Sequence, residues 1–309
     1  MRPMGALHLG HYHGVLKNWV RLQPDHDCFF FVADWHALTD APQSDEPRLE
    51  AHIYDMVVDW LAAGIDPARS TLFLQSRLPE HAELFTLLGM VTPQTWLREL
   101  PGAAEAGTFG QLAYPLLQAA DILIHRADFV PVAEDQEPLI ELTRRIAHHF
   151  NGAHGEAGVP VLTEPRLLVT NTGYLPGLDG RKMSSRAGNA IAMRDTPEVV
   201  TTKVRAAPTT PGMPAQCGVF ALQHTYLDAA THQELGRRCT EGAADCLSCK
   251  QPLIEAIVRE QAPIRARADA YLAQPKQVQW LLELGTERAR GVARETMKHV
   301  RRALHLGPH

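Results

Sequence analysis

Two short apolar runs constrain the fold of this chain more than any other feature. Cys28–Ala33 and Thr71–Leu74 are bounded by polar residues, which is typical of parallel strands buried on both faces. Between them, apolar residues from Ile53 to Leu61 recur at helical spacing, and the pattern stops at Gly64. Residues 28–74 are therefore expected to form a strand, a helix and a second strand.

This alternation continues beyond the second strand. Helices are predicted over 84–91, 114–124 and 139–150, with a strand at Phe129–Val132. The order predicts an α/β fold, a Rossmann-like doubly wound parallel sheet that binds ligands at the carboxyl ends of its strands. From Gly152 to Arg194 the chain is rich in glycine, and we expect irregular structure with a mobile loop.

An all-helical domain is predicted after residue 195. Thr196 is suited to cap a helix that starts at Pro197, and strand-like patterns do not return. We therefore expect domains at 1–195 and 196–309. The last helix, about 286–304, is expected to pack back on the first domain, with its basic face in solvent or against a nucleic acid.

Charge and hydropathy exclude several classes of protein. The net charge of -5 argues against a globally basic nucleic-acid binder, although a local basic patch remains compatible with RNA. No apolar run is long enough to cross a bilayer and no secretion leader is visible. We expect a cytoplasmic protein without a membrane partner.

His8-Leu9-Gly10-His11 places two imidazoles around a glycine just before an amphipathic helix. The start of a helix binds phosphate through free N–H groups, and His8 and His11 can donate to phosphoryl oxygens. Gly10 lets a nucleoside approach the backbone. The alternative is a turn that carries two surface histidines.

Tyr114, Gln118 and Asp121 share one helical face within an apolar segment. Three buried polar groups need partners, which a small ligand or an internal hydrogen-bond network would supply. Asp135 and Gln136 follow the strand at 129–132. Asp135 can bind ribose there or cap the next helix, and Gln136 can bind an amino or carboxylate group.

A polar, glycine-flanked loop carries Arg181, Lys182 and Arg186. Such a loop can close on a polyphosphate and stabilise the charge that develops during reaction.

Four of the five cysteines cluster in the last third of the chain, as Cys217-x21-Cys239-x6-Cys246-x2-Cys249. In a cytoplasmic chain this favours a metal site over disulfides. Four thiolates suit zinc or a 4Fe-4S cluster, and their spacing does not distinguish the two.

The two signature segments, His8-Leu9-Gly10-His11 and Lys182-Met183-Ser184-Ser185, resemble those of class I aminoacyl-tRNA synthetases. The chain between them is similar to bacterial tryptophanyl-tRNA synthetases, and the resemblance spans nearly the whole sequence. The matching segments are Asp34–Thr39, Tyr114–Leu123, Glu134–Gln136 and Glu141–Arg144.

This resemblance implies an ATP-dependent ligase that forms tryptophanyl-adenylate from L-tryptophan and ATP with Mg²⁺, and then charges tRNA(Trp). It implies a homodimer and a helical anticodon-binding domain.

The implied catalytic, phosphate-contacting residues are His8, His11 and Lys182. The implied ATP-binding residues are Gly10, Asp135, Met183, Ser184, Ser185 and Arg186. The implied tryptophan-binding residues are Tyr114, Gln118 and Gln136 at the head group and Asp121 at the indole N–H. One branch of the family has a nearly identical cysteine spacing that holds an iron-sulfur cluster, which favours 4Fe-4S over zinc here.

Three positions depart from the family pattern. The strand that precedes the Arg2-Pro3 turn in the family is missing, so we expect an open sheet edge. Met4 replaces a small hydroxyl residue, and Ser185 replaces the second lysine of the loop signature. Arg186 is the candidate to replace that lysine at the pyrophosphate.

Three alternatives remain open at this stage. The Tyr, Gln, Asp arrangement also fits a tyrosine-specific sister enzyme, since a carboxylate accepts a phenol O–H as well. The departures fit a paralogue that binds tRNA or tryptophan with impaired aminoacylation. A small-molecule adenylyltransferase would share only the His-x-Gly-His segment and would leave the helical third unexplained.

Overall fold

The computed structural model describes residues 1–39, 49–132, 134–155, 159–169, 174–243 and 245–307. The following description concerns these residues.

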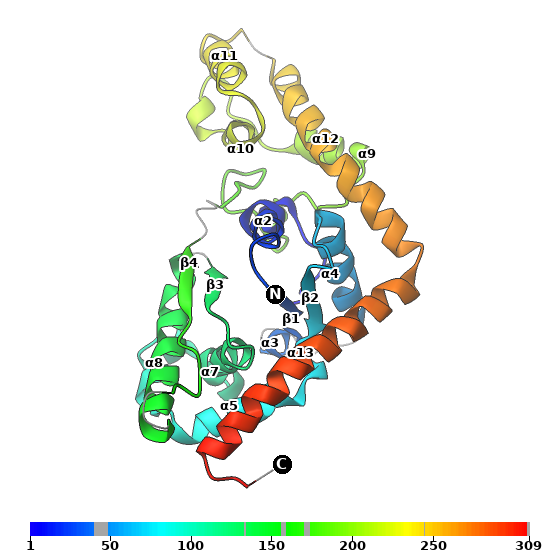
Figure 1. The fold of residues 1–309 in the computed structure, drawn as a ribbon. Helices are drawn as coiled ribbons and strands as arrows, with labels where there is room; N and C mark the ends of the chain where they lie inside the picture. Colours follow the sequence, from blue (N-terminus) through cyan, green and yellow to red (C-terminus); the bar gives the residue numbers. More distant parts are fainter. Residues whose placement is uncertain (40–48, 133, 156–158, 170–173, 244, 308–309) are drawn as a thin grey trace.

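Within the described part of the chain, four short strands form two parallel pairs (Figure 1). β1 (Cys28–Val32) pairs with β2 (Ser70–Leu74), and β3 (Phe129–Val132) pairs with β4 (Arg166–Val169). The predicted α/β class with parallel strands is confirmed. The described strands nevertheless make two sheets rather than one, because a pocket lined by β1 and by residues 125–131 separates β1 from β3.

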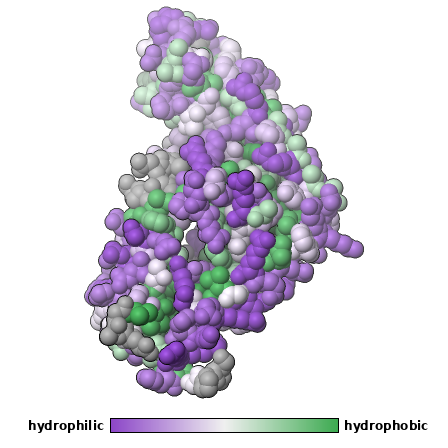
Figure 2. Space-filling view, viewed as in Figure 1, coloured by the Kyte–Doolittle hydropathy of each residue, from purple (hydrophilic) through white to green (hydrophobic). Residues whose placement is uncertain are grey.

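The edge of β1 that faces this pocket carries Met1. The Met1 amino group donates to the Phe31 carbonyl at 2.7 Å, and the Ala33 N–H donates to the Met1 carbonyl at 2.8 Å. Figure 2 shows a hollow near the middle of this face, close to the N-terminus marked in Figure 1.

Helices cover the strands as the apolar periodicity predicts. Proline at the first position of α5, proline at the second position of α8 and the positive φ of Gly64 after α4 account for three of their ends. The helices of this part are α1 (Leu9–His11), the π-helical η1 (Tyr12–Leu16), α2 (Lys17–Leu22), α3 (Asp34–Ala37), α4 (Leu49–Ala63), η3 (Gln75–Arg77), α5 (Pro79–Val91), α6 (Gln94–Arg98), η4 (Ala103–Glu105), α7 (Phe109–Leu123), η5 (Glu134–Gln136) and α8 (Glu137–His154).

β4 corrects the expectation of irregular structure from Gly152 to Arg194. Its sequence, Arg166–Val169, contains an apolar run of only three residues, and its pairing partner β3 lies far away in the sequence. A strand that depends on a distant partner leaves a weak local signal.

The rest of the chain is helical. It contains α9 (Pro197–Ala206), η6 (Pro214–Gln216), α10 (Gly218–Tyr226), α11 (Ala229–Thr240), α12 (Cys246–Leu272) and α13 (Pro275–Ala303). Thr196 caps α9 by accepting the Val199 N–H, as predicted. Figure 1 shows α10 and α11 at the top, away from the strands, while α13 runs back beside β2 and α5.

α13 is longer than predicted and packs tightly on the first part of the chain. A Cβ on Gly285 would collide with the backbone of Leu72 in β2, so this crossing requires glycine. Its arginines pair with α5 rather than pointing only to solvent, since Arg301 binds Glu83 at 2.5 Å and Arg294 binds Glu80 at 3.3 Å.

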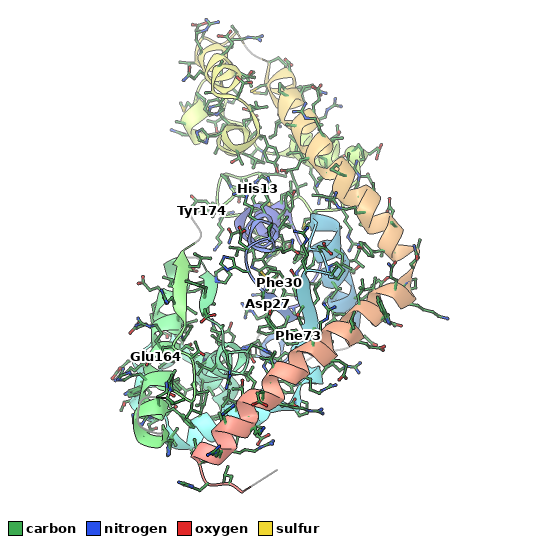
Figure 3. The ribbon with its side chains drawn as sticks, in the orientation of Figure 1. His13, Asp27, Phe30, Phe73, Glu164 and Tyr174 are labelled. Carbon is green, nitrogen blue, oxygen red and sulfur yellow. The ribbon has the colours of Figure 1, made fainter. Side chains whose placement is uncertain are left out.

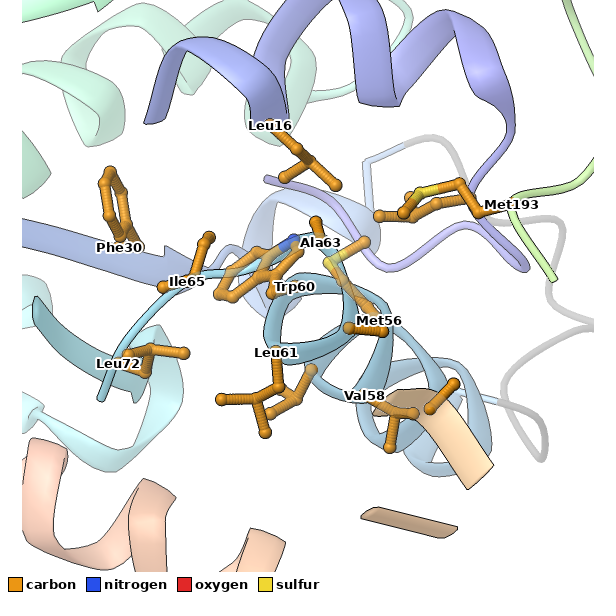
Figure 4. Packing of buried hydrophobic residues seen from close by; sticks show 14 of the residues in the cluster. Leu16, Phe30, Met56, Val58, Trp60, Leu61, Ala63, Ile65, Leu72 and Met193 are labelled. Atoms are coloured by element: carbon orange, nitrogen blue, oxygen red, sulfur yellow. The ribbon is translucent and has the colours of Figure 1, made fainter. Parts of the chain in front are cut away.

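One apolar cluster joins β1, β2, α4 and the start of the chain (Figure 4). Trp60 is fully buried at its centre, near Leu16, Phe30 and Met193. Burial of a large aromatic side chain stabilises a fold by about 3–5 kcal/mol. The cluster therefore gives the His8–His11 segment, which lies between its members Leu7 and Leu16, a stable support.

Candidate functional site

The His8–His11 segment is tied to the chain that follows the Lys182 loop. The Leu9 N–H donates to the Ile191 carbonyl, and the Met193 N–H donates to the Leu7 carbonyl, both at 2.9 Å. The structure thus brings the two segments together, which a joint role in a phosphate site would require.

A buried ion pair that the sequence does not predict supports this junction. Asp59 of α4 lies 2.8 Å from Arg194 and accepts the Leu7 N–H at 3.2 Å. Burial raises the pKa of Asp59 to about 6, although the charge of Arg194 opposes this. Asp59 looks like an ordinary polar position of an amphipathic helix, so no local signal marks it.

His8 and His11 stack with their ring centroids 3.8 Å apart. Burial lowers the pKa of both to about 4, and the charges of His8 and Lys182 lower that of His11 further. Both rings are therefore neutral at pH 7. The Nδ1 of His11 accepts the His8 N–H at 3.3 Å, which places the proton of His11 on Nε2 as a donor.

Gly10 is needed for packing within the protein. A Cβ at this position would lie 2.8 Å from Nδ1 of His8 and 3.3 Å from Cβ of Met183. Met183 is buried in an apolar cluster with Leu9 and Leu175. Met183 thus anchors the Lys182 loop under the first segment, and the nucleoside contact of Gly10 remains a prediction.

The Lys182 loop is a hairpin organised around Asn189. The buried Asn189 amide donates to Asp179 at 2.6 Å and to the Lys182 carbonyl at 3.2 Å, and its oxygen accepts the Ser184 N–H at 2.8 Å. Sequence analysis did not predict Asn189 as a site residue. Its short polar side chain in a loop is too common to stand out.

The cations of this loop face outward. Lys182, Ser185 and Arg186 are exposed, and among the described residues no carboxylate lies within ion-pair distance of Lys182 or Arg186. Their charges are available to an anionic ligand.

Asp121 is fully buried and bound by three donors. His81 Nδ1 lies 2.5 Å and His36 Nε2 lies 2.9 Å from its oxygens, and the Gln75 amide donates to both oxygens at 3.0 and 2.8 Å. Burial disfavours the charged carboxylate, but the hydrogen bonds from His36 and His81 outweigh burial and hold the pKa of Asp121 well below its usual range. The internal network expected as an alternative is therefore present here.

His81 connects Asp121 to a further histidine. Its Nε2 lies 3.1 Å from Nε2 of His125, whose pKa is lowered by burial to about 3. His36, Gln75 and His81 were not predicted, because they come from other segments that only the fold brings to Asp121. His125 was not predicted either, although its position one turn after Asp121 is visible in the sequence.

Tyr114 and Gln118 lie two turns and one turn, respectively, before Asp121 on α7. The Tyr114 ring contacts the His36 ring edge-on, with centroids 4.4 Å apart. The Oε1 atom of Gln118 is buried and has no hydrogen-bond partner among the described residues. This helix face therefore carries one hydrogen-bond acceptor without a described partner, Gln118 Oε1, beside the Asp121 carboxylate, which accepts from three donors.

Asp135 and Gln136 lie in η5, where β3 ends. Gln136, not Asp135, is the residue that precedes the first turn of α8, and it makes no side-chain capping bond. The alternative that Asp135 caps this helix is therefore wrong. The described contacts include no hydrogen bond from either side chain to the other candidate residues.

Cys217, Cys239, Cys246 and Cys249 border one small pocket in the helical region, together with Lys250. Burial raises the pKa of Cys249, and the Gln223 amide lies 3.8 Å from its sulfur. In the described part of the chain, no three His, Cys, Asp or Glu side chains are close enough to hold a single metal ion.

Among the described helices, none is both long and apolar enough to cross a membrane.

Comparisons with known proteins give a consistent result. The family model of class I tRNA synthetases (W and Y) matches residues 1–246. The chain is 42% identical to the tryptophan–tRNA ligase of Ralstonia nicotianae, covering 99% of this chain and 97% of the relative. It is 40% identical to that of Thermotoga maritima, covering 99% and 98%. Its structure resembles tryptophanyl-tRNA synthetase from Campylobacter jejuni complexed with ADP and tryptophan, with a TM-score of 0.87, 27% identity and coverage of 99% and 98%.

Proposed function

Because this chain belongs to the class I tRNA synthetases for tryptophan and tyrosine, we propose that it is a tryptophan–tRNA ligase. The junction of the His8–His11 segment with the Lys182 loop carries most weight. It brings neutral imidazole donors and exposed cations to one place, as binding of a polyphosphate requires.

In the proposed first step, a carboxylate oxygen of tryptophan attacks the α-phosphorus of ATP. The bond from this phosphorus to the β-bridging oxygen breaks, pyrophosphate leaves, and tryptophanyl-adenylate forms. In the second step, a ribose hydroxyl at the 3′ end of tRNA(Trp) attacks the activated carbonyl and AMP leaves. The protein contributes positioning and charge stabilisation, and no protein nucleophile is needed.

The phosphate side of the site has distinct donors. His11 donates from Nε2 to a phosphoryl oxygen without carrying charge, and Lys182 and Arg186 neutralise the departing pyrophosphate. Mg²⁺ bound with ATP would neutralise further phosphate charge. Ser184 and Ser185 can donate hydroxyl hydrogen bonds, and Asp135 is proposed to bind ribose.

The tryptophan side uses the face of α7. The unpartnered Oε1 of Gln118 suits the substrate ammonium group, and Tyr114 and Gln136 are proposed to complete the head-group site. Asp121 remains the proposed acceptor for the indole N–H. Its carboxylate already accepts from three donors, so the indole would share an oxygen with one of them.

Tryptophan-dependent exchange of pyrophosphate into ATP tests this function. We expect exchange with tryptophan, little with tyrosine, and charging of tRNA(Trp). Exchange with tyrosine alone would assign the sister specificity, which the 42% and 40% identical relatives disfavour. Tryptophan binding without exchange would identify the impaired paralogue that Ser185 motivates.

We also propose a 4Fe-4S cluster at the four cysteines. All four cysteines line one pocket in the described structure. In a cubane cluster each thiolate binds a different iron, whereas zinc requires all sulfurs at about 2.3 Å from one centre. Anaerobic purification should give brown protein with about four irons per chain, whereas stoichiometric zinc without acid-labile sulfide would contradict the cluster.

A homodimer and a cytoplasmic location complete the proposal. Both follow from the family resemblance and from the proposed tRNA substrate. Sedimentation of the purified chain tests the dimer.

A further inference from the structure

α10 is a nine-residue helix that contacts the residues next to both signature segments. It begins at Gly218, directly after Cys217, and ends at Tyr226. Its first residue packs on the Lys182 loop, and its last residue contacts the helix that follows His11.

The first contact is between two glycine backbones. A Cβ on Gly218 would lie 2.8 Å from the Leu178 carbonyl oxygen, 2.5 Å from the Asp179 carbonyl carbon and closer still to the Gly180 nitrogen. All three atoms belong to loop backbone, which cannot rotate away as a side chain can. Any residue other than glycine at 218 must therefore displace the segment that leads into Lys182.

The second contact is a polar cluster at the other end of α10. The Tyr226 hydroxyl lies 3.1 Å from Nε2 of His13 and donates to Glu260 Oε2 at 2.9 Å. Glu260 of α12 also binds His13 at 2.9 Å and Lys17 at 2.7 Å. Figure 3 shows His13 on the helical turns below α10.

His13 lies in the π-helical segment that follows His11 directly. π-Helical turns interrupt the regular ladder and are frequent at functional sites. The cluster holds this irregular turn from outside. Burial opposes ionisation of Glu260, yet hydrogen bonds from His13 and Lys17 lower its pKa to about 2, so the cluster keeps its anion at neutral pH.

We propose that α10 sets the spacing between the His8–His11 segment and Lys182, with Gly218 and Tyr226 as positioning residues for the adenylation step. This inference rests on the proposed function. Neither residue touches the proposed substrates, and both act through the signature segments that they hold.

Gly218→Ala tests the first contact. We expect kcat of tryptophan-dependent exchange to fall on the order of 10- to 100-fold, because small misplacements of reacting groups have large effects. The KM for ATP should rise, and the KM for tryptophan should stay within about twofold of wild type since α7 is untouched. Gly236→Ala is the matched control, because its Cβ would meet only the ring end of Phe220 at 2.9 Å.

Tyr226→Phe tests the second contact. Because it retains the aromatic ring, it also provides a test if Gly218→Ala fails to fold. It should lower kcat about threefold to tenfold through the lost hydroxyl, again with an unchanged KM for tryptophan. Wild-type values of kcat and of the KM for ATP in the folded variants would overturn the inference.

Hydrogen exchange separates this inference from the proposed function. The Met183 N–H donates to the Leu175 carbonyl at 3.1 Å, so displacement of the loop should accelerate its exchange in Gly218→Ala but not in Gly236→Ala. If the wild-type protein shows no tryptophan-dependent pyrophosphate exchange, the proposed function fails. The hydrogen-exchange measurement still tests whether α10 positions the Lys182 loop. Unaltered protection of the loop in folded Gly218→Ala would contradict the role of α10 in either case.

Discussion

The two sides of the candidate site are built in opposite ways. On the tryptophan side, Asp121 is buried and saturated by His36, Gln75 and His81 within one part of the fold. On the phosphate side, Lys182 is exposed on a loop that meets His11 from a distant part of the sequence. The first side is preorganised by hydrogen bonds, whereas the second depends on how two segments are held together.

This difference predicts where function and stability separate. Changes at Lys182 or Arg186 should reduce rate with little loss of stability, because these two side chains are exposed. Changes at Asp121 should reduce both, because removal of one member leaves buried partners unsatisfied.

Lys182→Ala should have the largest effect on rate. This variant loses the only lysine of the loop, whose charge is proposed to stabilise the leaving pyrophosphate, and we expect pyrophosphate exchange to slow about 1000-fold. The midpoint of thermal unfolding should stay near wild type. Lys298→Ala, an exposed lysine beside Glu295 on α13, is the control. A large loss of stability in Lys182→Ala would break the comparison.

Asp121→Asn should come next and affect both quantities. The asparagine retains the shape of the side chain but turns an N–H₂ group toward the donors that bind Asp121. We therefore expect the KM for tryptophan to rise about 10- to 100-fold and the free energy of unfolding to fall by about 2–3 kcal/mol. The KM for ATP in the same variant is the internal control. An unchanged KM for tryptophan would remove Asp121 from the substrate site and leave it with a structural role.

The fold and the phosphate side were largely predictable from the sequence. Strand runs, helical periodicity and the Thr196 cap are local signals, and the His8–His11 and Lys182 segments are recognisable by residue type and order. β4 was missed because its stability depends on β3. The interruption of the first helix at Tyr12–Leu16 was missed because a π turn shifts the apolar stripe too little to alter the pattern.

The tryptophan side was predictable only in outline. Tyr114, Gln118 and Asp121 share one helix, so their spacing shows a common face. The partners of Asp121 come from α3, η3 and α5, and no window of sequence joins them. The Gly180–Gly218 contact was hidden for the same reason, since nothing local distinguishes a glycine that meets a distant backbone.

His8→Gln should sharpen the comparison through pH. The folded pKa of His8 is about 4, below its ordinary value of 6.5, so its contribution to stability is complete above pH 6.5 and is lost as pH falls toward 4. The lowered pKa of His11 also makes the folded state less stable as pH falls, whereas the raised pKa of Asp59 makes it more stable. Between pH 7 and 4.5, His8→Gln should lose less stability than wild type, by on the order of 2 kcal/mol in urea unfolding. Parallel pH curves would show that His8 is not the acid-sensitive group.

Ser185→Lys should have the smallest effect and tests how complete the phosphate side already is. Ser185 is exposed beside Arg186, and a lysine there would restore the cation that the family signature contains. If Arg186 already reaches the pyrophosphate, a second cation adds little, and exchange should rise no more than about threefold. Arg186→Ala should then slow exchange in the wild-type background but much less in the Ser185→Lys background. A tenfold gain from Ser185→Lys alone, together with no effect of Arg186→Ala, would instead mean that the natural chain lacks this contact and that the open side of the site limits its rate.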